Sequence, residues 1–198
     1  MRASYSNNTV RVYQAYSSEI AVPALAAGKF VPPFSVNRMT WIKPSFNWMM
    51  YRSGYGTKPG QETVLGIDIT REGFEWALKN SVLSSFFPDV HSTSENWKDL
   101  LAAKPVRIQW DPERDWKLNV VSGLRAIQIG LAGEAVARYV NQWIVHIENL
   151  TPVVRTIAAA VTSGGRPPVL PSESEHSYPL DAATAKTVCA YHPVHAAD

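Results

Sequence analysis

The amino-acid sequence predicts a single α+β domain with a central mixed or antiparallel sheet and flanking helices. Three observations support this fold class. Segments rich in β-branched and aromatic residues alternate with segments that carry helix-capping residues. The chain has 198 residues, 45% of them hydrophobic, which is enough for one sizeable core. The composition changes only after Gly164, so we expect one domain over residues 1–163 and a proline-rich C-terminal tail over residues 164–198 that wraps the surface or is flexible.

The first predicted element is a strand over residues 9–16, TVRVYQAY, because β-branched and aromatic side chains favour extended backbone. A helix is expected to follow it directly. Ser17 or Ser18 can cap its start, and Gly28 can end it in a left-handed conformation. Pro23 lies early enough in this helix to be tolerated near the first turn.

The later elements are read in the same way. Residues 63–69, TVLGIDI, predict a buried strand, and Thr70 caps a helix over residues 71–83 with Phe74, Leu78 and Val82 on one face. Residues 106–110, VRIQW, alternate as a strand does. We also expect a short helix over residues 97–102, strands over residues 124–131 and 144–147, and helices over residues 133–140 and 152–161.

Composition limits the classes of function. The formal charge of +2 is too small to predict nucleic-acid binding by itself, so any electrostatic argument has to be local. The single cysteine, Cys189, excludes an internal disulfide framework and a cysteine-only metal cage. No stretch approaches the roughly 18 apolar residues of a membrane helix, and the first residues lack the apolar run of a signal peptide. We therefore expect a soluble cytoplasmic protein with no membrane partner.

The most informative stretch is residues 37–55, NRMTWIKPSFNWMMYRSGY, which interleaves cations, rings and small polar groups. No Asp or Glu occurs from residue 20 to residue 61, so the local field is positive. Such a lining suits a ligand with flat rings and phosphates, and Pro44 favours a loop that presents side chains. The alternative is that the rings are core material with a solvated cationic rim. The candidate ligand-binding residues here are Arg38, Trp41, Lys43, Ser45, Phe46, Tyr51 and Arg52.

Two further candidates lie on the first strand. Because side chains alternate between the faces of a strand, Arg11 and Tyr13 point one way while Gln14 and Tyr16 point the other. Only one set can face a cleft. We favour Gln14 with Tyr16 toward the ring of the ligand, although Arg11 is the better phosphate or ribose anchor on chemical grounds.

An acidic cluster follows the strand over residues 106–110. In QWDPERD, residues 109–115, a strand end fixes the position while the loop exposes Asp111, Glu113 and Asp115. The structural alternative is a charged turn with weak surface ion pairs. No histidine accompanies the cluster, and the chain has neither a nucleophile elbow nor a glycine-rich phosphate loop. We expect no metal site, including at the tail histidines His176, His192 and His195.

Four blocks carry a resemblance to known sequences: RVYQAY, RMTWIKPSFNWMMYRSG, QWDPERD and RAIQIGL. They resemble those of a domain-of-unknown-function family found in bacteria and fungi, over about residues 10–157. This resemblance implies a single domain and no particular activity.

The order of motifs is also similar, more distantly, to that of the ADP-ribosyltransferases, which cleave NAD and transfer ADP-ribose. That resemblance implies their fold, NAD as substrate and a late carboxylate, which Glu113 supplies as the catalytic candidate. Gln14 stands where many members carry a histidine, with Arg11 as the alternative from the arginine-bearing branch. A carboxylate near the ribose would stabilise an oxocarbenium-like centre. The pyrophosphate would lie against Arg38, Lys43 or Arg52.

Two hypotheses of function follow. The first is an NAD-dependent ADP-ribosyltransferase-like enzyme that acts on nucleic acid or nucleotides. The second is a non-catalytic module that binds DNA, RNA or nucleotides in the same basic aromatic groove by stacking and phosphate contact. A binding module has no reason to place an acid among phosphates, so Glu113 facing the groove would favour the enzyme.

Overall fold

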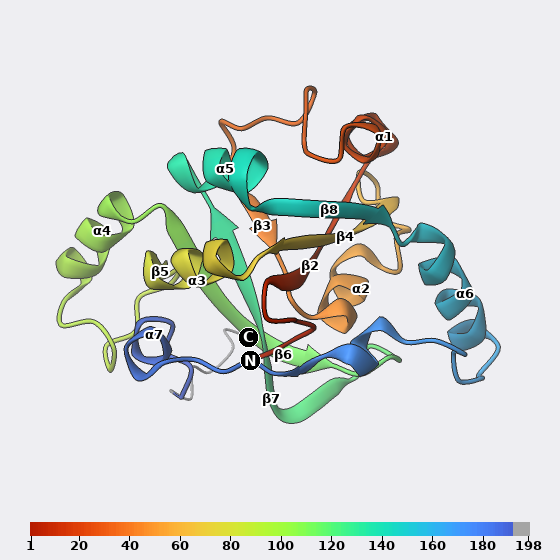
Figure 1. The fold of residues 1–198 in the computed structure, drawn as a ribbon. Coiled ribbons are helices and arrows are strands. Elements are labelled where there is room, and N and C mark those ends of the chain that lie inside the picture. Colours follow the sequence, from red (N-terminus) through yellow and green to blue (C-terminus); the bar gives the residue numbers. More distant parts are fainter. Residues whose placement is uncertain (192–198) are drawn as a thin grey trace.

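The computed structural model describes residues 1–191 and shows a single α+β domain, as expected, but with two main sheets in place of one central sheet. Two sheets make its centre (Figure 1). One contains three strands, and the other contains four; a two-residue pair joins β1 and β9. The strands are β1 (Arg2–Ala3), β2 (Thr9–Tyr16), β3 (Thr40–Ile42), β4 (Thr63–Thr70), β5 (Ser81–Leu83), β6 (Val106–Arg114), β7 (Val120–Leu131), β8 (Ile144–Asn149) and β9 (His176–Ser177).

The three-stranded sheet has the order β2-β4-β8 and is antiparallel throughout. The four-stranded sheet has the order β3-β7-β6-β5 and is mixed, because β5 runs parallel to β6 while the other pairs are antiparallel. The sheets meet where the backbone of Tyr13 on β2 pairs with that of Lys43, just beyond β3. This junction places one end of β2 beside the edge strand of the other sheet.

Helices cover the sheets. The bounds are α1 (Ser18–Ala27), α2 (Phe46–Ser53), α3 (Arg71–Lys79), α4 (Ser94–Ala103), α5 (Glu134–Arg138), α6 (Thr151–Thr162) and α7 (Ala182–Thr187), with a π-helical turn over Tyr139–Trp143 and a 3-10 turn over Pro171–Ser174. Helix α1 lies above β8 in the view of Figure 1. Gly28 ends it at a φ of 66°, as its sequence position predicts. The main hydrophobic core includes Val10, Val12, Ile67, Ile108 and Ile129.

The structure corrects three expected elements. The helix expected over residues 71–83 ends at Lys79, and residues 81–83 form β5, because Val82 and its neighbours pair in parallel with β6. The helix expected over residues 133–140 is the short α5 continued by the π-helical turn. The loop expected around Pro44 opens α2, whose signals are Ser45 as N-cap and Gly54 in a left-handed C-cap.

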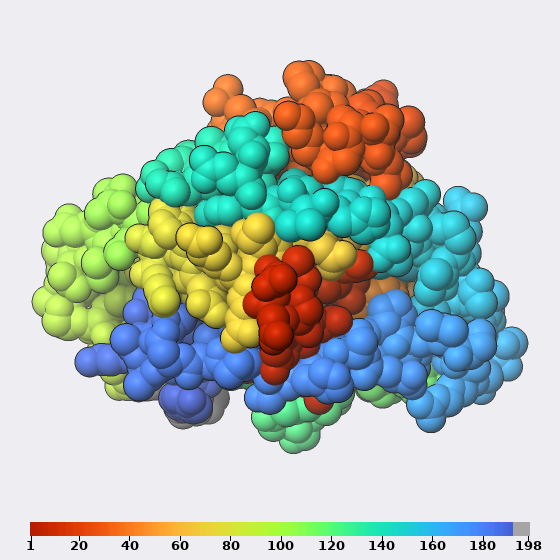
Figure 2. All heavy atoms as spheres, in the orientation of Figure 1, coloured from red at the N-terminus to blue at the C-terminus, as the bar shows by residue number. Residues whose placement is uncertain are grey.

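Residues 164–191 lie against the domain and contribute to its packing. Leu170, Tyr178 and Val188 are buried, and β9 pairs with β1 near the start of the chain. Figure 2 shows this segment (blue) running beside the N-terminal residues (red). Among residues 1–191, no helix has the length and apolar character needed to cross a membrane. The expectation for His192 and His195 lies outside the described residues.

Candidate functional site

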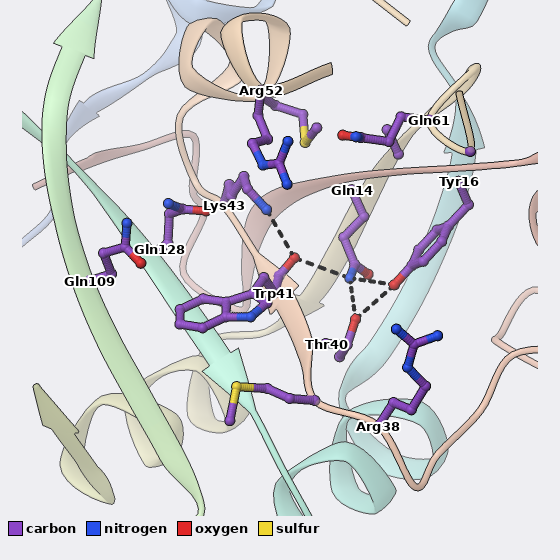
Figure 3. A pocket seen from close by; sticks show the side chains of 14 residues that line it. Gln14, Tyr16, Arg38, Thr40, Trp41, Lys43, Arg52, Gln61, Gln109 and Gln128 are labelled. Carbon is purple, nitrogen blue, oxygen red and sulfur yellow. Dashed lines mark hydrogen bonds between the residues drawn. The ribbon is translucent and has the colours of Figure 1, made fainter. Parts of the chain in front are cut away.

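The pocket that gathers most of the expected ligand-binding residues extends around β3, the edge strand of the four-stranded sheet (Figure 3). Its volume is about 670 Å³. β2 lies on one side, β6 and β7 on the other, and α2 with the following loop closes one end. The lining includes Gln14, Tyr16, Arg38, Thr40, Trp41, Lys43, Arg52, Gln61, Gln109 and Gln128.

Trp41 supplies the aromatic wall. It pairs with Gly130 across β3 and β7, and its indole lies on the bare backbone at that glycine. A Cβ added to Gly130 would come within 2.9 Å of the ring and 3.0 Å of the Met39 sulfur. The ring can lie against the strand only because residue 130 has no side chain, so the pocket has a flat apolar surface beside polar groups.

Three cations line the pocket. Arg38 and Arg52 are exposed, while Lys43 is only 6% exposed. Within residues 1–191, none of the three forms a salt bridge, although Arg11, Arg71, Arg138 and others do. Lys43 Nζ makes one long hydrogen bond, 3.4 Å to the Trp41 carbonyl. Burial and then the charge of Arg52 lower the pKa of Lys43 to about 8.

A buried hydrogen-bond network forms the wall on the β2 side. Tyr139 donates to Gln14 Oε1 at 2.7 Å, and Gln14 Nε2 donates to Thr40 Oγ1 at 2.7 Å. Tyr16 and Thr40 share one hydrogen bond of 2.7 Å. That bond uses one of their two hydroxyl hydrogens, and the other has no acceptor among the described residues, so it is available to a ligand oxygen. Burial raises the pKa of Tyr16 to about 12, which keeps its hydroxyl protonated.

Two amides line the opposite side. Gln109 on β6 and Gln128 on β7 are directly paired across the strands. Both donate to the carboxylate of Asp111, Gln109 at 3.0 Å and Gln128 at 2.7 Å. Four residues of the lining were not among the site residues expected from the sequence: Thr40, Gln61, Gln109 and Gln128. The signal that could have found the two amides is strand alternation, because in VRIQW and RAIQIG each is a polar residue between buried apolar ones.

Arg11 lies elsewhere. It faces the opposite side of β2 from Gln14 and Tyr16, as alternation predicts, and lines a separate cavity with Tyr13. Its guanidinium is bidentate with Asp68, at 2.6 and 2.7 Å, and also binds Glu148. This cation is already neutralised by two carboxylates, whereas the three cations of the pocket are not.

Glu113 also lies outside the pocket. A register shift between Pro112 and Arg114 breaks the alternation of β6, and Glu113 turns away from the face that carries Gln109 and Asp111. It is 6% exposed and accepts hydrogen bonds from Ser45 Oγ at 2.7 Å and from the Arg114 N–H at 2.9 Å. It lines a different cavity of about 260 Å³.

The surroundings of Ser45 are structural as well. Ser45 caps α2 by accepting from the Trp48 N–H at 3.1 Å, and the Phe46 N–H donates to Glu175 at 2.7 Å. Burial raises the pKa of Glu175 to about 8; the Phe46 N–H opposes the shift and Glu113 adds to it. The C-terminal segment thus fastens the start of α2 through Glu175.

The two remaining aromatic candidates also face other partners. Phe46 is buried in the smaller core cluster, edge-on to Tyr13. Tyr51 contacts Arg114, whose guanidinium carbon lies 3.8 Å from the centre of the Tyr51 ring. Of the ten candidate site residues, the pocket therefore gathers five: Gln14, Arg38, Trp41, Lys43 and Arg52.

The pocket is not built for a metal ion. Its lining holds amides, hydroxyls and cations, and within residues 1–191 no cluster of three His, Cys, Asp or Glu side chains is placed to bind a metal. The arrangement suits an anionic ligand with a flat ring. The cations can bind the anionic group, the indole can stack on the ring, and the amides can hydrogen-bond to the edge of the ring.

Comparison with known proteins identifies a family that matches most of the chain. No curated protein matches the chain. A family described as "Domain of unknown function (DUF4291)" matches residues 1–176, which include both sheets, every residue of the pocket and Glu175. The chain therefore belongs to the DUF4291 family.

Proposed function

We propose that the pocket around β3 binds a nucleotide, with phosphates against Lys43 and Arg52 and a ring against Trp41. The observation that carries this proposal is the set of three cations without a carboxylate partner among residues 1–191, on a pocket whose lining contains no Asp or Glu. Like charges placed close together and partly desolvated oppose folding unless an anion neutralises them. A phosphate group supplies that anion.

Binding of ADP and NAD should depend on Arg52. Arg52→Ala is expected to weaken ADP binding about tenfold, because a charge-assisted phosphate contact contributes roughly 1.5–3 kcal/mol. Isothermal titration at two salt concentrations measures this, and the salt dependence should decrease in the variant. Arg155→Ala is the matched control, because Arg155 is an exposed arginine on α6 outside the pocket. Equal ADP affinities for wild type and Arg52→Ala would contradict the proposal.

A second candidate function is ADP-ribosyl transfer from NAD. The pocket could accommodate NAD by the same contacts, with the pyrophosphate at the cations and one ring on Trp41. The bond between ribose C1′ and the nicotinamide nitrogen would break, nicotinamide would leave with the bonding electrons, and an acceptor atom would bond to C1′ and lose its proton. The carboxylate to test for this candidate is that of Asp111, which is not part of the pocket lining but accepts hydrogen bonds from two of its amides.

Two carboxylates near the end of β6, Asp111 and Glu113, are the candidates for the catalytic group, and variants of each distinguish them. Nicotinamide release from NAD is measured with DNA, RNA and protein acceptors present. If Asp111 stabilises the oxocarbenium-like centre, Asp111→Asn lowers release about a hundredfold while Glu113→Gln leaves it largely intact, since Glu113 is directed toward Ser45. If only Glu113→Gln loses nicotinamide release, Glu113 is the catalytic carboxylate, as the sequence predicted. No release by the wild type leaves nucleotide binding as the function.

A further inference from the structure

Two amides, those of Gln109 and Gln128, form the part of the pocket wall next to Trp41. Gln109 and Gln128 stand opposite each other on β6 and β7, on the face that also carries Trp41. Gly130, where the indole lies, is two residues from Gln128 on the same strand and therefore on the same face. A ring stacked on Trp41 would have its edge near these two amides.

A glutamine amide can normally face a ligand in two ways, because its carbonyl and NH₂ ends have nearly the same shape. The carbonyl end accepts from an amino group, and the NH₂ end donates to an oxo group. Two glutamines whose amides can both rotate could therefore bind a ring with an amino group or a ring with an oxo group. Without a third group, the pocket would have no means of choosing.

Asp111 removes this freedom. Its carboxylate oxygens accept hydrogen bonds, and both amides turn their NH₂ groups toward them. Asp111 Oδ2 accepts from Gln128 Nε2 at 2.7 Å, and Oδ1 accepts from Gln109 Nε2 at 3.0 Å. Among the described residues, no donor reaches either glutamine carbonyl oxygen, and these acceptors are left for the ligand.

We infer that Asp111 is a positioning residue that makes the pocket select a ring bearing an amino group, such as the 6-amino group of adenine, over the corresponding oxo ring. This inference rests on the proposed nucleotide binding. The amide carbonyl accepts from the amino group, whereas an oxo group in the same place sets two acceptors against each other and leaves both without a donor. An amide carbonyl that accepts from the 6-amino group is one half of the bidentate contact that amide side chains make with adenine.

The test compares AMP with IMP, which differ in the 6-amino and 6-oxo groups. Wild type should bind AMP at least about tenfold more tightly than IMP, within the range that a well-placed base contact provides. Asp111→Asn keeps the shape, but its own NH₂ lets one amide reverse, so the ratio should fall to within about threefold. Asp115→Asn is the control, because Asp115 binds only groups of its own turn and should keep the wild-type ratio.

Each other outcome has a distinct meaning. Equal binding of AMP and IMP by the wild type, or a preference for IMP, overturns the inference and leaves nucleotide binding in place. If Asp111→Asn keeps the wild-type preference for AMP over IMP, Asp111 does not determine which ring the pocket selects. If the wild type binds neither nucleotide, the proposed function fails and the inference fails with it. Circular dichroism of each variant confirms that the fold is retained.

Discussion

Lys43→Met is expected to raise the thermal stability of the protein and, at the same time, to weaken phosphate binding at least about tenfold. The wild-type amine is buried, forms no salt bridge among residues 1–191 and has Arg52 nearby, and the charge of Asp111 offsets these effects only in part. Its pKa falls from 10.5 to about 8, which corresponds to roughly 3 kcal/mol of unfavourable free energy in the charged form. Methionine fills similar space without the charge. Differential scanning calorimetry at pH 7 should show an increase in Tm of several degrees.

The pH dependence gives an independent check. The folded amine releases its proton at a lower pH than the unfolded one, so the unfolded state binds more protons between about pH 8 and 10.5. The stability of the wild type relative to Lys43→Met should therefore rise with pH across that window, while below it the penalty is fully present. Phosphate affinity should fall as the pH passes about 8. Lys58→Met, at an exposed lysine of the same acid-free stretch, should change neither quantity. A lower Tm for Lys43→Met would contradict the account.

Gly130→Val is expected to remove ring recognition while leaving phosphate binding in place. The new side chain would occupy the space of the Trp41 ring, since even a Cβ alone comes within 2.9 Å of it. Stacking of a base on an aromatic side chain contributes about 1–3 kcal/mol, so AMP affinity should fall roughly tenfold or more. Ribose 5-phosphate, which has no base, should bind as it does to the wild type.

A double-mutant cycle tests whether the effect acts through the indole. Trp41→Leu should weaken AMP binding about as much as Gly130→Val, and the double variant should lose little more than either one. Valine suits a strand, so the fold should persist. Additive losses in the double variant, or equal losses for AMP and ribose 5-phosphate, would show that Gly130 does not act by holding the ring.

Sequence reasoning placed the strand over residues 9–16 and the helix after it correctly because their signals are local. The β-branched residues of the strand and the glycine that ends the helix act within a few positions of one another, whereas Ser17 stands at the N-cap position but its side chain makes no capping hydrogen bond. The α+β class and the separation of Arg11 from Gln14 on opposite faces of β2 follow from the same local periodicity. Helix α2 was not predicted, because the mixture of rings and cations has no helical periodicity and was interpreted as a loop. The capping residues Ser45 and Gly54 are nevertheless present at its two ends.

The sequence by itself determined the fold class, the first elements and the positive charge of the stretch over residues 37–55. Only the tertiary structure decided which residues meet. The register shift after Pro112 turns Glu113 away from Gln109, the β6–β7 register sets Gln109 opposite Gln128, and the β3–β7 pairing brings Trp41 to Gly130 from a distant part of the chain. Alternation along one strand is a local property of the backbone, but register and bulges depend on the partner strand. Side chains that are far apart in sequence therefore become neighbours only once the sheets have formed.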